Sequence, residues 1–322
     1  METKRLSFKH KNNKLLYYAI NYLRWMIPSS YYKNRLKNKL KTLSKFEKET
    51  IISRVNFYNK LDNTFELNEK AKKLSDLNIK EKQRTYLFDL YEYSRFFNQN
   101  LKGHFLFGDI IHVPNEPSLT KSRPISDKNQ NSVILKWNKI RHFTFVGNDI
   151  DFLSKKDMLV WRGKVHSTWL HRILFVEMYF KHPLCDIGRV NTSNLNPEWK
   201  RSRMTISEQL DYKFILSIEG KDVASNLKWI MSSNSIAVMP SPKFETWFME
   251  SLLIPDYHYI LIKDDYSDLE YKLNYYMEHP DEAQEIIKNA HEFVKQFKNK
   301  KSEDLISLLV LKKYFEKTGQ LY

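Results

Sequence analysis

The chain has 322 residues, of which 42% are hydrophobic and 14% aromatic, enough for two domains with cores of their own. Its net charge is +15, and its one cysteine, Cys185, excludes an internal disulfide and indicates a reducing compartment. No stretch approaches the roughly 20 apolar residues that span a bilayer, and no signal-peptide pattern follows the charged N-terminus. We therefore expect a cytoplasmic protein.

Residues 1–50 form a basic arm with 13 Lys and Arg against 3 Asp and Glu, so they hold +10 of the net charge. Apolar residues recur at helical spacing from Leu15 to Met26, and Pro28 ends the predicted helix. Such a helix either lies on an anionic membrane surface or packs on the body with its basic face in water. Both interpretations remain open. No recognised reading motif follows, so we do not expect a nucleic-acid partner.

Residues 51–155 are less regular and are predicted to form an N-terminal α/β domain. We expect a helix over residues 84–100, a strand over 103–114 and another strand over 141–147.

From residue 156 to 300, apolar runs alternate regularly with amphipathic segments. The predicted strands are residues 157–161, 185–190, 213–219, 235–239 and 257–263. The predicted helices are residues 167–180, 205–212, 224–233, 244–253, 267–279 and 281–297, and residues 301–322 form a last helix. Such alternation predicts a parallel sheet covered by helices, which binds ligands beyond the carboxyl ends of its strands.

Charged residues and glycines follow four of these strands. If the sheet is parallel, they meet at one edge, where cations and glycines suit a diphosphate and carboxylates suit sugar hydroxyls. These residues are Arg162, Gly163, Gly220, Asp222, Lys243, Glu245, Lys263, Asp264 and Asp265. Their joint placement favours a nucleotide-type ligand.

Gly220 stands at a strand-to-helix joint in a chain with seven glycines. A glycine there lets a ligand approach the backbone, and the first turn of the next helix offers free N–H groups to an anion. Ser225, Asn226 and Lys228 would surround that anion. The alternative is an ordinary loop with a turn glycine and a solvated lysine.

Several other classes of site are not indicated. The sequence contains no phosphate-binding P-loop, no GxGxxG, no GxSxG and no HExxH. The "DID" at Asp149–Asp151 has the form of the DxD motif of metal-dependent glycosyltransferases, and it is kept as an alternative.

The segments "WRGK", "YKFILSIEGKDVASNLKWIMSSNSIAVM" and "IPDYHYILIKDDYSDLE" resemble glycosyltransferase family 90, the CAP10-like and lipopolysaccharide-modifying group. The resemblance covers roughly residues 85–300. It implies a GT-B-like fold of two Rossmann-type domains with a cleft between them, here with the basic helical arm added. It also implies an inverting transfer from a UDP-sugar that needs no metal cofactor.

The resemblance assigns roles to individual residues. Arg162 matches an arginine near the donor phosphates, while Gly220 and Lys228 match a glycine and a basic residue of the donor site. Asp109, in "LFGDIIHVP", resembles the aspartate that serves as catalytic base, and Asp222 is the first alternative to it. The "SNS" of the family is Ser233, Asn234 and Ser235, and Lys121 and Arg123 are candidates for acceptor or phosphate contacts.

One departure from the family is Asn226, which stands where many members carry arginine. The chain also lacks the signal and cysteines of eukaryotic members, so it looks like a bacterial, cytoplasmic version. The implied acceptor is a glycan or glycolipid at the inner membrane face, such as lipopolysaccharide core, with the arm on an anionic membrane surface. The competing function is a non-catalytic protein that binds membrane or nucleic acid.

Overall fold

The computed structural model describes residues 9–33, 35–41, 45–80 and 83–321. The chain divides into two compact units. Unit 1 comprises Met1–Asn12, Arg141–Pro242 and Ser251–Gln296; unit 2 comprises Asn13–Ile140, Lys243–Glu250 and Phe297–Tyr322. Both units are therefore built from segments that lie far apart in the sequence.

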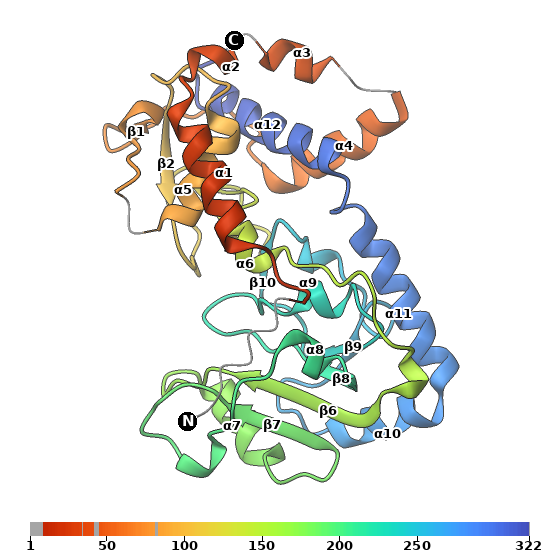
Figure 1. Ribbon diagram of the computed structural model, residues 1–322. Coiled ribbons are helices and arrows are strands. Elements are labelled where there is room, and N and C mark those ends of the chain that lie inside the picture. Colours follow the sequence, from red (N-terminus) through yellow and green to blue (C-terminus); the bar gives the residue numbers. More distant parts are fainter. Residues whose placement is uncertain (1–8, 34, 42–44, 81–82, 322) are drawn as a thin grey trace. The chain divides into compact units, whose positions relative to one another are not determined.

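Unit 1 is built on a five-stranded sheet in the order β11-β9-β8-β6-β7, and every neighbouring pair is parallel (Figure 1). Its strands are β6 (Lys156–Gly163), β7 (Cys185–Arg189), β8 (Tyr212–Leu216), β9 (Ile236–Met239) and β11 (Ile260–Leu261). Its helices are α7 (Leu170–Tyr179), α8 (Ile206–Gln209), α9 (Leu227–Ile230), α10 (Leu269–Glu278) and α11 (Pro280–Lys295), with short 3-10 turns at Phe152–Ser154 and Pro197–Trp199. The predicted parallel sheet with helices between its strands is confirmed.

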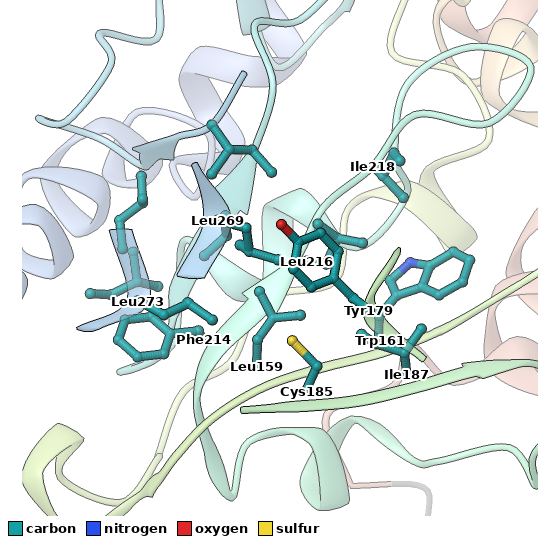
Figure 2. Packing of buried hydrophobic residues seen from close by; sticks show 14 of the residues in the cluster. Leu159, Trp161, Tyr179, Cys185, Ile187, Phe214, Leu216, Ile218, Leu269 and Leu273 are labelled. Carbon is teal, nitrogen blue, oxygen red and sulfur yellow. The ribbon is translucent and has the colours of Figure 1, made fainter. Parts of the chain in front are cut away.

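The core of unit 1 lies between the sheet and its helices. Figure 2 shows Leu159, Phe214 and Leu216 from neighbouring strands packed with Leu269 and Leu273 of α10. All five side chains are buried, as expected for the near-continuous apolar runs of parallel strands. This packing fixes the strand ends, from which the loops of the candidate site emerge.

Unit 2 holds a four-stranded sheet in the order β1-β2-β3-β5 and a two-stranded sheet of β10 and β4. Its strands are β1 (Lys72–Lys73), β2 (Lys102–Leu106), β3 (Ser118–Thr120), β4 (Ser122–Pro124), β5 (Ser132–Ile134) and β10 (Phe244–Thr246). Its helices are α1 (Lys14–Met26), α2 (Ser30–Lys33), α3 (Leu36–Leu40), α4 (Lys45–Tyr58), α5 (Arg84–Ser94) and α12 (Lys300–Lys317), with a 3-10 turn at Leu74–Asp76. Two short elements, α6 (Lys139–His142) and the 3-10 turn Glu250–Leu252, are divided between the units along the sequence.

The last helix, α12, packs against α4 and α5, so the C-terminal segment completes the unit that the N-terminal segments begin. Glu303 of α12 is buried and pairs with Arg54 of α4 at 2.6 Å and with Lys136 at 2.5 Å. The unit boundaries fall at residues 12/13, 140/141, 242/243, 250/251 and 296/297, whereas the sequence suggested divisions after residues 50, 155 and 300. A contiguous division misses α12 because its partners lie some 200 residues earlier.

Several predicted elements differ from the structure. The strand predicted over residues 103–114 is β2 and ends at Leu106, and the helix predicted over residues 205–212 is confined to α8. Residues 244–253, predicted as one helix, form β10 and a 3-10 turn, because Phe244–Thr246 pairs antiparallel with Ser122–Pro124. The strand predicted over 141–147 is wrong, since α6 ends at His142 and the following residues form no strand. The helix predicted over 224–233 is confined to the four residues of α9.

The N-terminal helix predicted up to Pro28 is present as α1, and it lies along α5 within unit 2 (Figure 1). Among the described residues, no helix is long and apolar enough to cross a membrane. The first eight residues of the predicted arm lie outside the described residues.

Candidate functional site

The topology of unit 1 singles out one place for a ligand, the carboxyl ends of β6 and β8. The chain runs from β6 to β7 on one side and then returns to β8 on the other side of β6. Such a reversal of strand order leaves a crevice beyond the strand ends, where open α/β sheets bind their ligands. Gly163 ends β6, and the loop after β8 carries Gly220 and the segment from Asp222 to Asn226.

Arg172 of α7 joins these two loops. Its guanidinium donates from Nη1 to the Lys164 carbonyl at 2.7 Å, from Nη2 to the Ile218 carbonyl at 2.8 Å and from Nε to the Glu219 carbonyl at 2.8 Å. Burial lowers the pKa of Arg172 to about 10, which leaves it protonated at neutral pH. The protonated guanidinium of Arg172 thus holds the loops after β6 and β8 together.

Sequence reasoning missed Arg172. The available signal was a single arginine inside the apolar helix "LHRILFVEMY", a place where a long cation is costly to bury unless it has partners. Within the described residues Arg172 forms no ion pair, a property it shares with the buried Arg95 and Arg189, and its hydrogen-bond partners are carbonyl oxygens. Glu219 stabilises its charge electrostatically without a contact, and the positive charge that remains at these loops favours an anion.

Gly220 is needed for a close approach, but the approaching group belongs to the chain itself. A Cβ atom at Gly220 would lie 3.1 Å from Nη2 of Arg172 and 3.4 Å from the Trp169 ring. Its N–H donates to the Asp222 carbonyl at 2.9 Å. The glycine therefore makes room for the arginine that links the two loops, rather than leaving the backbone open for a ligand.

Gly163 is likewise explained by packing inside unit 1. A Cβ atom there would fall 2.1 Å from Cζ2 of Trp161, so a larger residue would displace the indole from the core. The neighbouring Arg162 is held on the sheet by Asp186, with Nη2 2.6 Å from the carboxylate oxygen, and it is largely buried. Its guanidinium is engaged within the sheet rather than extended toward the loops.

The residues expected around an anion after Gly220 differ in burial. Asp222 and Lys228 are buried, Lys228 completely, while Ser225 is half-buried. Asn226 donates from Nδ2 to the Leu216 carbonyl at 2.9 Å, which ties the loop back to the end of β8. The helix that follows this loop, α9, has only four residues and begins at Leu227.

The "SNS" segment has internal roles in unit 1. Ser233 donates to the Ile230 carbonyl at 2.7 Å, and Ser235 donates to the Tyr212 carbonyl at 2.8 Å. The Asn234 N–H donates to Oδ2 of Asp149 at 2.7 Å. These bonds tie α9 to β8 and to the segment that precedes β6.

The carboxylates of "DID" are engaged as well. Oδ2 of Asp149 also accepts from Nζ of Lys155 at 2.9 Å, and Asp151 caps a 3-10 turn by accepting from the Leu153 N–H at 2.9 Å. Across the described part of the chain, no three His, Cys, Asp or Glu side chains are grouped so that they could hold a metal ion.

Asp109 belongs to unit 2 and follows β2. Its carboxylate is 35% exposed and contacts the ammonium of Lys121, which is buried. Gly108 before it has a φ of 112°, a left-handed conformation that other residues rarely adopt, so the turn that presents Asp109 depends on glycine. Lys121 fixes the direction of the carboxylate and leaves part of it open to a substrate.

A hollow of about 670 Å³ lies beside this turn, within unit 2. It is lined by Asn78, Lys80, Gln83, Phe105, Leu106, Phe107 and Ile110. Aromatic rings together with amide and ammonium donors suit the apolar faces and the hydroxyls of a sugar. Asp109 precedes Ile110, one of the residues that line the hollow.

Arg123 and Glu245 do not take part in this surface. They form an ion pair of 2.6 Å inside unit 2, and both side chains are buried. Arg123 also donates to the carbonyls of Phe57, Tyr58 and Ser132. The pair joins β4 to β10 and to the end of α4, so both residues have a structural explanation in place of the expected ligand contacts.

The parallel sheet of unit 1, with its loops meeting where the strand order reverses, is consistent with a Rossmann-like sugar transferase. The comparisons with known proteins agree. The model of the family described as "Glycosyl transferase family 90" matches residues 130–316. The chain belongs to glycosyl transferase family 90, as the motifs in its sequence indicated, and it is a glycosyltransferase.

Two curated proteins illustrate the relationship. The O-glucosyltransferase LpsA of Dichelobacter nodosus is 41% identical over 265 residues, which cover 82% of each protein. The uncharacterized protein 179R of Invertebrate iridescent virus 6 is 30% identical over 121 residues, which are 35% of this chain and 10% of the viral protein.

Proposed function

We propose that this protein transfers a sugar from a UDP-sugar to a hydroxyl of a glycan or glycolipid, with inversion at the anomeric carbon and without a metal. The observation that carries the proposal is the pair of loops after β6 and β8, held together by Arg172 in a member of family 90. UDP-glucose is the first donor to test, because the related LpsA is named an O-glucosyltransferase.

In the proposed reaction, the diphosphate lies at the loops of unit 1, where the charge of Arg172 favours an anion. An acceptor oxygen attacks the anomeric carbon from the side opposite to UDP, and Asp109 takes the proton of that hydroxyl. The bond from the anomeric carbon to the phosphate oxygen breaks, and UDP leaves with the electron pair. Lys121 positions the carboxylate of Asp109, and the adjoining hollow receives the acceptor sugar.

The proposed acceptor class rests on the family resemblance of the sequence and on the charge of the N-terminal arm. We propose a glycolipid such as lipopolysaccharide core, met at the inner face of a bacterial cytoplasmic membrane. The metal-dependent alternative has less support, since Asp149 and Asp151 already accept hydrogen bonds from the chain. A non-catalytic role would leave Asp109 dispensable.

The test measures UDP release and sugar transfer by the purified protein with a panel of UDP-sugars, with and without EDTA. Glycolipids from cells with and without the protein are compared by mass spectrometry. Asp109→Asn should keep UDP affinity and lose about 10²–10⁴ in transfer, the usual contribution of a general base. The matched control is Asp127→Asn, an exposed carboxylate of the same unit, which should transfer at the wild-type rate.

An Asp109→Asn enzyme within a few-fold of wild type would remove Asp109 as the base and direct attention to Asp222. Activity that disappears in EDTA and returns with manganese would contradict the metal-independent mechanism.

A further inference from the structure

The N-terminal helix α1 presents an apolar face to solvent. The exposed fractions are 86% for Leu15, 56% for Leu16, 62% for Leu23 and 78% for Met26, and Ala19 between them is also exposed. At 100° per residue these five side chains fall on one side of the helix, at the spacing of an amphipathic helix. The face is continuous and contains no charged residue.

The opposite face of α1, which is more polar, is the one that packs on unit 2. The Tyr17 hydroxyl donates to Oδ1 of Asp89 at 2.8 Å, and Arg24 pairs with Glu92 at 2.8 Å. The Trp25 ring lies 4.5 Å from that of Tyr91, centroid to centroid. The attachment of α1 to α5 therefore uses hydrogen bonds, an ion pair and aromatic rings.

This arrangement reverses the usual orientation of a surface helix, whose apolar side faces the core and whose polar side faces water. The side chain of Asn21 is buried while Leu15 and Met26 are exposed. The described part of the chain leaves this apolar face uncovered.

The charge around α1 indicates what would cover this face. Residues 9–41 contain nine Lys and Arg and no Asp or Glu. Among them, Lys11, Lys14, Lys37 and Lys41 are exposed. Aliphatic side chains flanked by cations are the composition of a helix that lies in the headgroup region of an anionic bilayer, where both contributions add.

We propose that the face formed by Leu15, Leu16, Ala19, Leu23 and Met26, called here the lipid face, inserts into an anionic phospholipid surface while α1 stays attached to α5. The two interpretations of the arm that the sequence leaves open, packing on the body and lying on a membrane, then hold together on opposite sides of one helix. The benefit to catalysis rests on the proposed function: it confines the enzyme to the surface that carries a glycolipid acceptor.

The experiment uses the full chain and vesicles of phosphatidylethanolamine mixed with phosphatidylglycerol, with pure phosphatidylcholine vesicles for comparison, in a flotation assay. The test variant is Leu15→Ser/Leu23→Ser. The matched control is Leu153→Ser, whose side chain is 57% exposed on unit 1, outside the arm. Both substitutions lie on the surface, so thermal unfolding should remain at the wild-type temperature.

The wild type and the control should float with the anionic vesicles, and the double variant should bind at least tenfold more weakly. Added salt should weaken binding of the wild type to the anionic vesicles, because it screens the exposed cations. Equal flotation of the double variant and the wild type, or no binding of the wild type to anionic vesicles, would overturn the proposal. So would a wild-type dimer that the double variant abolishes, which would assign the lipid face to a second copy.

Vesicle binding is measured without donor or acceptor, so it does not depend on turnover. Transfer to a soluble acceptor sugar by the double variant should equal that of the wild type. Failure of transfer in both proteins would refute the proposed function, but it would not contradict the proposal that the lipid face binds membrane.

Discussion

Replacing Glu245 with glutamine distinguishes a structural role for this residue from the donor contact that the sequence suggested. The carboxylate lies 2.6 Å from Nε of Arg123, and the side chains of the pair are 2% and 0% exposed. Glutamine keeps the size and one oxygen acceptor but removes the negative charge. The variant therefore leaves a buried guanidinium whose remaining partners are the carbonyls of Phe57, Tyr58 and Ser132.

Breaking a buried ion pair by removing one partner costs about 3–5 kcal/mol. Because glutamine can still accept a hydrogen bond and the carbonyls remain, we expect the lower end, about 3 kcal/mol. With an m-value of about 2 kcal/mol/M, the urea midpoint of unit 2 should fall by about 1.5 M. Substituting apolar residues for both partners should recover little, since the carbonyls that Arg123 satisfies would then be left without a donor.

The assay is urea unfolding followed by circular dichroism, together with UDP affinity of the folded protein by calorimetry. The control is Glu285→Gln, whose partner Lys288 is on the surface of α11 and whose loss should cost at most about 0.5 kcal/mol. An unchanged midpoint combined with a large loss of UDP affinity would refute the structural explanation and restore Glu245 to the donor site.

Two further predictions concern Arg172 and the attachment of α1. In Arg172→Lys, the lysine cannot reach three carbonyls at once. UDP binding should therefore weaken by about tenfold or more, while the urea midpoint changes little. Unchanged UDP affinity in calorimetry would exclude Arg172 from the donor site. Burial alone would raise the pKa of Glu92, but Lys139 and Arg24 lower it from 4.5 to about 2. Glu92 therefore stabilises the fold above about pH 4.5 and loses this effect as the pH falls toward 2, so wild type should lose more stability over that range than Glu92→Gln in urea unfolding; parallel losses would disprove the linkage.

The sheet of unit 1 could be predicted because each of its central strands is a local signal. Segments such as "KFILSI" and "SIAVM" are apolar runs between turns, and their identity does not depend on distant residues. The carboxyl ends of parallel strands lie at the same edge of a sheet, and Arg172 joins the loops after β6 and β8 there. Lys243 and Glu245, expected at the same edge, belong to unit 2. The prediction of a helix over residues 244–253 was wrong because this segment depends on distant residues: Phe244–Thr246 is a strand because Ser122–Pro124 pairs with it.

The sequence places the candidate site at the strand ends of unit 1, but it does not show which side chains its residues contact. Gly220 and Gly163 were singled out correctly as unusual, yet what they accommodate is Arg172 and Trp161. A sequence shows that a glycine is present but not which side chain occupies the space beside it. The role of Arg162 could not be predicted for the same reason, because its partner Asp186 comes from a neighbouring strand.

The place of α12 in unit 2 has a consequence for the order in which the protein matures on the ribosome. Unit 1 needs residues only as far as Gln296, whereas unit 2 lacks its helix α12, and Arg54 and Lys136 lack the carboxylate of Glu303, until residues 300–317 have emerged. The N-terminal segments of unit 2 therefore lack part of their packing until the last helix has been synthesised, when the chain of unit 1 is already complete.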